Sequence, residues 1–423
     1  MFDFNEDLLQ FIWKYKLLKP GKYITESGRE IKIINYGELN SDSGPDFFNA
    51  KIKIDNITLA GNVEIHVKAS DWKKHHHHKD NAYSNVILHV VYENDEKKSS
   101  SAGCETLVIK KHFDSEIIKK YKGLVNSERK LPCAKHIGKI SEIKINTWLE
   151  RLLVERLESK TLYIENIFTQ TGNDYAAAFY TLFLRNLGFK VNAEPFETLA
   201  RHLPLPVLLK HSNNLFQLEA LIFGTAGLLE KTYSEKYIQQ LQNEFEFLRN
   251  KYKLHPLKQG VWKFMRMRPA NFPSMRMWQL AKIIHHEREF FSNPSDFNSV
   301  KKLETAISHN PEGYWQCHYS LGGAKQDETG RLGRTSVENI MINTMAPFLF
   351  FYHKRNGKEN FNPMNLLEEL ESETNAKTRI FTGCGLKTEN AGQSQALIQL
   401  YDNYCKKKNC LQCAIAAQLL LNP

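Results

Sequence analysis

The sequence contains no uninterrupted run of eighteen apolar residues, so we expect no helix that spans a membrane. The first residues, MFDFNEDLLQFIWKYKLL, lack the basic stretch that precedes the apolar core of a secretory leader, which argues against a signal peptide. Phe4, Leu8, Ile12 and Trp13 recur instead at the spacing of an amphipathic helix. Both absences favour a cytoplasmic protein.

Cysteine is scarce and odd in number, with seven residues in a chain of 423. A disulfide framework needs paired cysteines and an oxidising compartment, so we expect reduced thiols in the cytoplasm. No repeat of fixed period is present, and a chain of this length predicts two or three domains.

Positive charge is in surplus, with 57 lysines and arginines against 47 acidic residues and a formal net charge of +10. A basic protein of this size favours polyanionic partners, and nucleic acid, DNA before RNA, is the first candidate. A lysine-rich solvated surface explains the same surplus equally well.

The most informative stretch is residues 44–92. Within it Glu64, His66 and Lys68 alternate with apolar residues, so on a strand these three side chains share one face. Asp46, at the start of the preceding predicted strand, can then lie beside Glu64. Two neighbouring carboxylates repel each other unless a cation lies between them, and oxygen ligands suit magnesium or manganese. A basic group on the same face can orient a water or neutralise a phosphoryl oxygen.

A proline–aspartate pair ending in Asp46, followed by an acid-any-basic triplet starting at Glu64, resembles the motif of the PD-(D/E)XK nuclease superfamily. His66 stands where that superfamily has lysine. The resemblance implies that Asp46 and Glu64 hold one or two magnesium or manganese ions, with the carbonyl of Ile65 as a further ligand. Either His66 or Lys68 then positions the attacking water or stabilises the charge of the transition state.

The predicted element order is also similar to the α-β-β-β-α-β core of that superfamily: a helix at 5–17, strands at 31–36, 49–54 and 57–68, a helix at 71–83 and a strand at 85–92. We therefore expect an α/β nuclease-like domain over residues 1–135. An all-α domain with a cysteine-containing tail is expected over 140–423. The segments GPDFFNAKI, GNVEIH, RPANFP and the cysteine tail make the whole chain similar to an uncharacterised bacterial family of unknown function, which supplies no activity.

Four consecutive histidines occupy positions 75–78. They could coordinate a transition metal, contact phosphate or simply face solvent. A zinc hydrolase built from Glu64, His66, His76 and His78 is therefore one alternative to a metal-dependent nuclease. A non-catalytic nucleic-acid-binding protein with a degenerate nuclease fold is the other.

Two arginine-containing segments are candidates for binding the nucleic-acid backbone. Arg266, Arg268 and Arg276 surround the RPANFP segment, where prolines precede a predicted helix and exposed helix amides suit phosphate. Arg331 and Arg334 lie in GRLGRTS, which leads into another predicted helix but lacks the lysine of a nucleotide P-loop. Structured loops whose arginines pair with carboxylates are the alternative.

The third candidate is the tail, where Cys405, Cys410 and Cys413 follow a predicted helix. Three or four thiolates in a reduced compartment suit zinc or an iron–sulfur cluster. Cys384 is the first candidate for a fourth ligand. Buried free cysteines on a short helix are the alternative.

Overall fold

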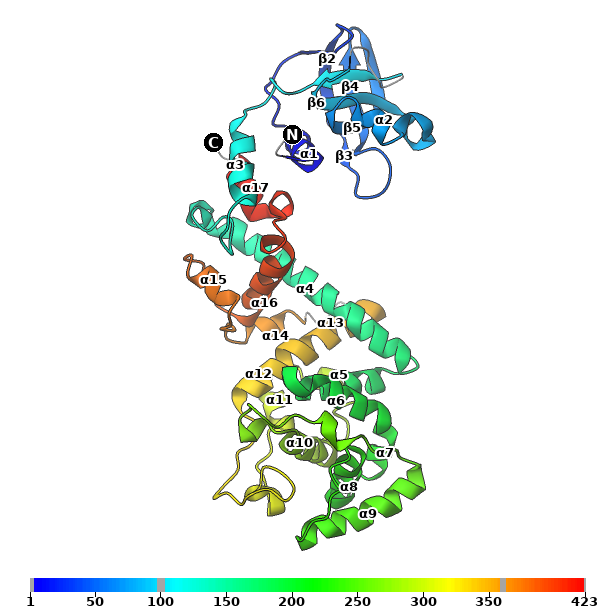
Figure 1. Cartoon of the computed structure of the whole chain (residues 1–423), viewed down its shortest axis with the longest axis vertical. Helices are drawn as coiled ribbons and strands as arrows, with labels where there is room; N and C mark the ends of the chain where they lie inside the picture. The colour runs from blue at the N-terminus through cyan, green and yellow to red at the C-terminus, as the bar shows by residue number, and fades with distance from the viewer. Residues whose placement is uncertain (1–3, 97–102, 358–362, 422–423) are drawn as a thin grey trace. The chain divides into compact units, whose positions relative to one another are not determined.

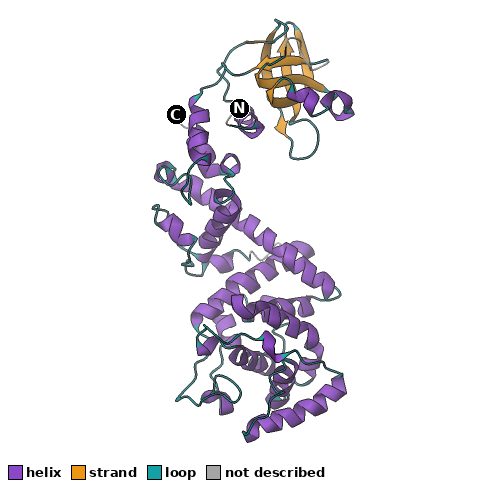
Figure 2. Cartoon of the chain, in the orientation of Figure 1, coloured by secondary structure: helices purple, strands orange, loops and turns teal. Residues whose placement is uncertain are grey.

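The computed structural model describes residues 4–96, 103–357 and 363–421, which divide into two compact units. The first comprises the described parts of 1–148, 383–386 and 400–423, and the second those of 149–382 and 387–399. The strands gather in the first unit, and helices dominate the rest of the described chain (Figure 2). The predicted order of an N-terminal α/β region followed by a largely helical region is confirmed. Among the described helices, none is both long and apolar enough to cross a bilayer.

A seven-stranded mixed sheet forms the core of the first unit (Figure 1). Its strands are β1 (Tyr23–Ile24), β2 (Glu30–Asn35), β3 (Glu38–Leu39), β4 (Phe47–Ile54), β5 (Ile57–Lys68), β6 (Val86–Glu93) and β7 (Glu105–Val108). The order is β1-β2-β4-β5-β6-β7, with β3 also paired to β4. Pairing is antiparallel up to β5 and parallel from β5 to β7, so the chain crosses over between β5 and β6.

Helical segments of the first unit are α1 (Glu6–Lys14), α2 (Asp71–Lys74), η1 (His77–Lys79), η2 (Asn81–Tyr83), α3 (Glu116–Val125), η3 (Ile137–Lys139), η9 (Leu400–Cys405), η10 (Cys410–Gln412) and α17 (Ala414–Leu421). The helix α1 packs along β5 and buries Leu8, Leu9, Ile12 and Trp13. The predicted series of a helix, three strands, a helix and a strand is present as α1, β2, β4, β5, α2 and β6.

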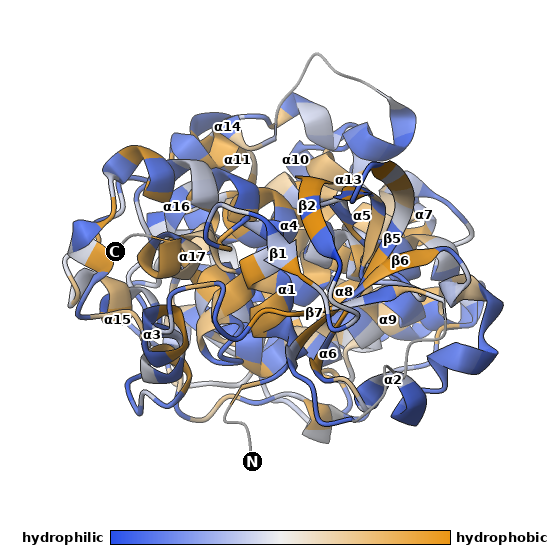
Figure 3. Ribbon diagram, turned by 90° about the horizontal axis from the view of Figure 1, so that it is seen from above, coloured by the Kyte–Doolittle hydropathy of each residue, from blue (hydrophilic) through white to orange (hydrophobic). Residues whose placement is uncertain are grey.

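The crossover between β5 and β6 contains less α-helix than the single helix that the sequence predicts at 71–83. Residues 71–83 form one α-helical turn and two 3-10 turns, because His76 adopts a left-handed backbone with φ of 63°. An L-residue in that conformation ends a right-handed helix. In Figure 3, α2 is coloured as hydrophilic, whereas β6 is coloured as hydrophobic. The parallel pairing places Glu64 opposite His89 and His66 opposite Val91.

The second unit consists of helices packed around aromatic side chains such as Phe179, Phe183 and Phe290, which are fully buried. Its α-helices are α4 (Glu142–Gln170), which begins in the first unit, α5 (Tyr175–Leu187), α6 (Phe189–His202), α7 (Leu205–Lys210), α8 (Leu215–Thr225), α9 (Lys236–Tyr252), α10 (Pro273–His286), α11 (Val300–Ile307), α12 (Arg334–Ile340), α13 (Ala346–Asn356), α14 (Asn365–Glu368), α15 (Thr378–Thr382) and α16 (Ala391–Gln399). Short turns are η4 (Gln259–Val261), η5 (Pro269–Asn271), η6 (Pro294–Asp296) and η7 (Gly313–Gln316), and η8 (Met341–Met345) is a π-helical segment.

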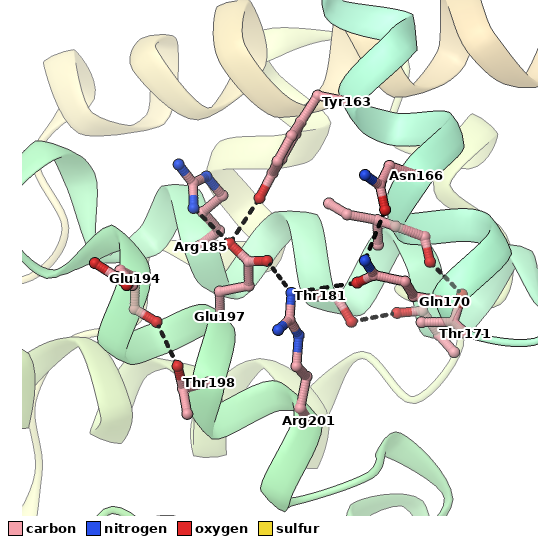
Figure 4. Close-up of polar contacts among 12 residues, drawn as sticks. Tyr163, Asn166, Gln170, Thr171, Thr181, Arg185, Glu194, Glu197, Thr198 and Arg201 are labelled. Atoms are coloured by element: carbon pink, nitrogen blue, oxygen red, sulfur yellow. Dashed lines mark hydrogen bonds and ion pairs between the residues drawn. The ribbon is translucent and has the colours of Figure 1, made fainter.

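A carboxylate joins three elements of this unit. Figure 4 shows Glu197 of α6 accepting hydrogen bonds from Tyr163 of α4, Arg185 of α5 and Arg201 of its own helix. Burial alone would raise the pKa of Glu197, but these donors and the two positive charges hold that pKa below its usual value. Glu197 therefore remains charged, and the network ties α4, α5 and α6 together.

Candidate metal centre

Two carboxylates meet where β4 begins beside β5. The backbone N–H of Asp46 donates to Oε2 of Glu64 at 3.1 Å. Oδ2 of Asp46 accepts from the N–H of Ile65 at 2.9 Å, and Oδ1 accepts from the amide of Gln10 on α1 at 2.8 Å. Adjacent strands and the covering helix thus fix both acidic groups, as the spacing of the proline–aspartate pair and the EIH triplet predicts.

Two histidines face the other oxygen of Glu64, and a third lies beside one of them. Nε2 of His66 lies 3.5 Å from Oε1 of Glu64 and 3.2 Å from Nδ1 of His75. Nε2 of His77 lies 3.3 Å from the same Oε1 and, among the described residues, is buried without a hydrogen-bond partner. One ring nitrogen from each histidine lies within 4.8 Å of the others, which is a spacing that could hold a metal ion.

The crossover explains how histidines of one short run converge. The helix α2 lies against β5 and ends at Lys74, so His75 and His77 do not follow helical spacing (Figure 1). The left-handed residue His76 reverses the chain between them. The structure therefore brings His75 and His77 to His66, whereas His76 and His78 lie outside this cluster with their ring centroids 6.2 Å apart.

Burial controls the protonation of this cluster. It raises the pKa of Glu64 to about 9, with the negative charge of Asp46 adding to the effect, and it raises that of Asp46 to about 6 and that of Glu6 to about 7. The same burial lowers the pKa of His66 to about 2 and that of His77 to about 4. Neutral imidazoles are the form that binds metal, and a cation would also favour the ionised carboxylates.

A second layer of side chains orients the histidines. His89, fully buried on β6, places Nε2 2.8 Å from Nδ1 of His66. Tyr83 stacks on the ring of His77 with centroids 3.8 Å apart. Burial raises the pKa of Tyr83 to about 12, and the charge of Glu64 acts in the same direction. Partners of this kind fix which ring nitrogen a metal-binding histidine presents.

Lys68 takes a different position. Its ammonium lies 3.9 Å from a carboxylate oxygen of Asp95, and 42% of its side chain is exposed. His66, two residues earlier on β5, is only 1% exposed and lies inside the cluster. The structure thus places His66 beside Glu64, and directs Lys68 toward the surface.

The five predicted arginines divide by exposure. Arg276 is 2% exposed, donates to Gln279 and Asn271, and lies over the ring of Phe189, so it is part of the core of the second unit. The four others are exposed: Arg266, Arg268, Arg331 and Arg334. Arg334 lies 2.9 Å from Glu338 on its own helix.

A basic cavity that the sequence does not reveal lies in the first unit. It has a volume of about 500 Å³ and lies between α3, the segment around η3 and α17. Its basic lining residues are Lys120, Arg129, Lys135, His136 and Lys139. Positive groups around one hollow suit a phosphate-bearing ligand.

The tail cysteines also belong to the first unit. Cys405, Cys410 and Cys413 are all buried, whereas Cys384 is partly exposed. A further buried cysteine, Cys133, comes from the segment before η3.

Comparison with known proteins gives one match. Residues 6–376 match a family model described as a protein of unknown function (DUF2851). The matched region contains the whole cluster around Glu64 and ends before the tail cysteines. No curated protein and no solved structure matches the chain.

Proposed function

Because the chain belongs to the DUF2851 family of proteins of unknown function, we propose its activity from its own residues: metal-dependent hydrolysis of phosphodiester bonds in nucleic acid. The observation that carries this proposal is the clustering of His66, His75 and His77, two of which, His66 and His77, also face Oε1 of Glu64. Two further features support the interpretation of that cluster as a nuclease site. They are the element order α1, β2, β4, β5, α2, β6 and the position of Asp46 beside Glu64.

The ligand set favours a transition metal. Three imidazoles, with the carboxylate of Glu64 beside two of them, suit zinc or manganese better than magnesium, which prefers oxygen ligands alone. Manganese is compatible both with the carboxylate pair and with the histidines. The buried Nε2 of His77, which has no hydrogen-bond partner among the described residues, fits such an ion.

The metal would supply a bound water of lowered pKa and a positive charge for the phosphoryl oxygens. Oε1 of Glu64 faces the histidine nitrogens that would bind the metal, while its Oε2 accepts a hydrogen bond from the N–H of Asp46. His75 is the exposed member of the cluster, so its side is the one from which substrate can approach. Asp46 lies next to Glu64 and can accept the proton of the attacking water.

The polyanionic substrate is supported by charge. The chain carries a net charge of +10, and the basic cavity of the first unit offers phosphate-binding groups. Nucleic acid is a polyanion that contains phosphodiester bonds, so it fits both the charge and the proposed chemistry. Reduced thiols agree with the cytoplasm as the location of the protein.

The experiment compares two histidines of the same run. We expect the full-length protein to bind manganese or zinc and to cleave labelled DNA or RNA with one of these ions. His77→Ala should lower metal affinity and cleavage by about 100-fold or more, since even partners behind a metal ligand are worth 10–100-fold. His78→Ala, which removes an exposed neighbouring imidazole, should leave both unchanged.

Three results would contradict this proposal. Equal metal affinity of the two variants would remove the cluster as the metal site. Cleavage that survives Asp46→Asn and Glu64→Gln would place hydrolysis elsewhere, and binding of nucleic acid without cleavage under any metal would leave a non-catalytic binding protein.

A further inference from the structure

Four buried cysteines lie in the first unit although one of them is far from the others in sequence. Cys133, Cys405, Cys410 and Cys413 are 5–7% exposed. Burial raises the pKa of Cys133 to about 12, and the charges of Cys413 and Cys410 act in the same direction. Burial likewise raises the pKa of Cys405, with contributions from Cys413 and Cys133. Each sulfur is therefore close enough to feel the charge of the others.

The backbone holds the segment of Cys133 against the tail. The helix α3 packs on η10 and on α17, the two elements on either side of Cys413. The ammonium of Lys408 donates to the carbonyl of Ser127, six residues before Cys133. Pro132, next to Cys133, lines the same cavity as Leu419 and Leu420 of α17. These contacts connect the two segments independently of the thiols.

The surroundings of Cys413 are built for an anionic sulfur. Burial raises its pKa, whereas the backbone N–H groups of Ala416 and Ile415 oppose that rise. A neutral thiol is a weak acceptor, so backbone donors beside a buried sulfur suit a thiolate. The positive charge of Lys408 acts in the same direction on Cys405 and Cys410.

We propose that Cys133, Cys405, Cys410 and Cys413 form a four-thiolate metal centre that fastens the tail to the first unit. Four buried thiols can all lose their protons only when a cation lies between them, and cysteine sulfur selects zinc or an iron–sulfur cluster. A tetrahedral zinc with Zn–S bonds near 2.3 Å requires sulfurs about 3.8 Å apart. In the described chain no three of these sulfurs lie within 4.8 Å of one another, so a single zinc would have to draw them closer together.

The first experiment measures bound metal in the full-length protein purified without oxygen. We expect one metal centre per chain, either zinc or iron with inorganic sulfide and a visible absorption band. Cys133→Ser and Cys410→Ser should each abolish this content, while Cys384→Ser, which changes the partly exposed cysteine, should retain it. Zinc with the same dependence on cysteines would identify zinc as the metal of the four-thiolate centre.

A second measurement works on the unaltered protein, in case a variant fails to fold. The four thiols should resist alkylation until a strong chelator is added, and then react together, whereas Cys384 should react from the start. The proposal is overturned if purified protein holds neither iron nor zinc, if Cys133→Ser keeps the metal, or if the chelator leaves alkylation of the four thiols unchanged.

Discussion

At the scale of single residues, the candidate centre depends on the oxygen that Glu64 presents to each neighbour. Oε2 accepts from the backbone of Asp46, and Oε1 faces the nitrogens of His66 and His77. Alternation along β5 predicts that Glu64 and His66 share a face, and the structure agrees. The same alternation could not reveal that His75 and His77 lie beside His66. Their positions depend on the left-handed backbone of His76, which the spacing of apolar residues does not show.

A second buried acid, Glu219 in α8, gives a prediction about pH. Burial raises its pKa from 4.5 to about 7, although the hydroxyl of Tyr237 donates to it at 2.8 Å and Lys282 lies near. The folded state therefore keeps a proton that the unfolded chain has already lost. Stability should fall as pH rises between about 4.5 and 7, by on the order of 3 kcal/mol at 1.36 kcal/mol per unit.

Glu219→Gln mimics the protonated form, so this variant should match the original protein near pH 4.5 and exceed its unfolding temperature at pH 8. Thermal unfolding at both values measures the difference. Glu230→Gln, at an exposed position, is the control and should show no such dependence. A Glu219→Gln variant that loses stability at pH 8 would show that the carboxylate is ionised and well solvated in the folded protein.

At the scale of elements, periodicity identifies most helices and strands. The strand at 57–68 has the bounds that the sequence predicts. Elements that depend on local backbone turns are less predictable: the helix expected at 71–83 is broken, and the helix expected after GRLGRTS is interrupted by the π-helical segment η8. Such changes preserve the apolar pattern, so hydropathy alone cannot show them.

Packing of α8 on α9 predicts the effect of a single methyl group. A Cβ on Gly224 would lie 2.1 Å from the ring of Phe245, which is 4% exposed. Gly224→Ala should therefore lower the free energy of unfolding by about 1–3 kcal/mol, despite the better helix propensity of alanine. Gly123→Ala in α3, where a Cβ would meet nothing within 4 Å, is the matched control and should be neutral or stabilising.

Chemical denaturation of the three proteins measures both changes. Phe245→Leu combined with Gly224→Ala should recover part of the loss, since the smaller side chain removes the ring. Equal effects of the two alanine substitutions would show that α8 and α9 are not in close contact at Gly224.

At the scale of the whole molecule, the chain returns to its first unit. Residues 400–423 cluster with residues 1–148, after more than half the chain has formed the second unit. A single sequence carries no signal for this return, which is why Cys133 cannot be paired with the tail cysteines from spacing. The same return lets α17 complete the basic cavity that Lys135 and Lys139 line from the other segment.

The last prediction concerns the basic cavity. If its groups bind nucleic-acid phosphates, affinity for duplex DNA should fall with salt, because each neutralised phosphate releases counterions. The slope of log affinity against log salt should be about 0.9 per phosphate contact. Lys135→Gln with Lys139→Gln should therefore reduce the slope of log affinity against log salt by about 2. Lys301→Gln with Lys302→Gln on α11 removes the same charge from exposed positions of the second unit and should leave the slope unchanged. Titration of a labelled duplex at several salt concentrations measures both. Equal reductions would mean that net charge alone attracts the duplex, because phosphates bound in the cavity can respond only to the charges that line it.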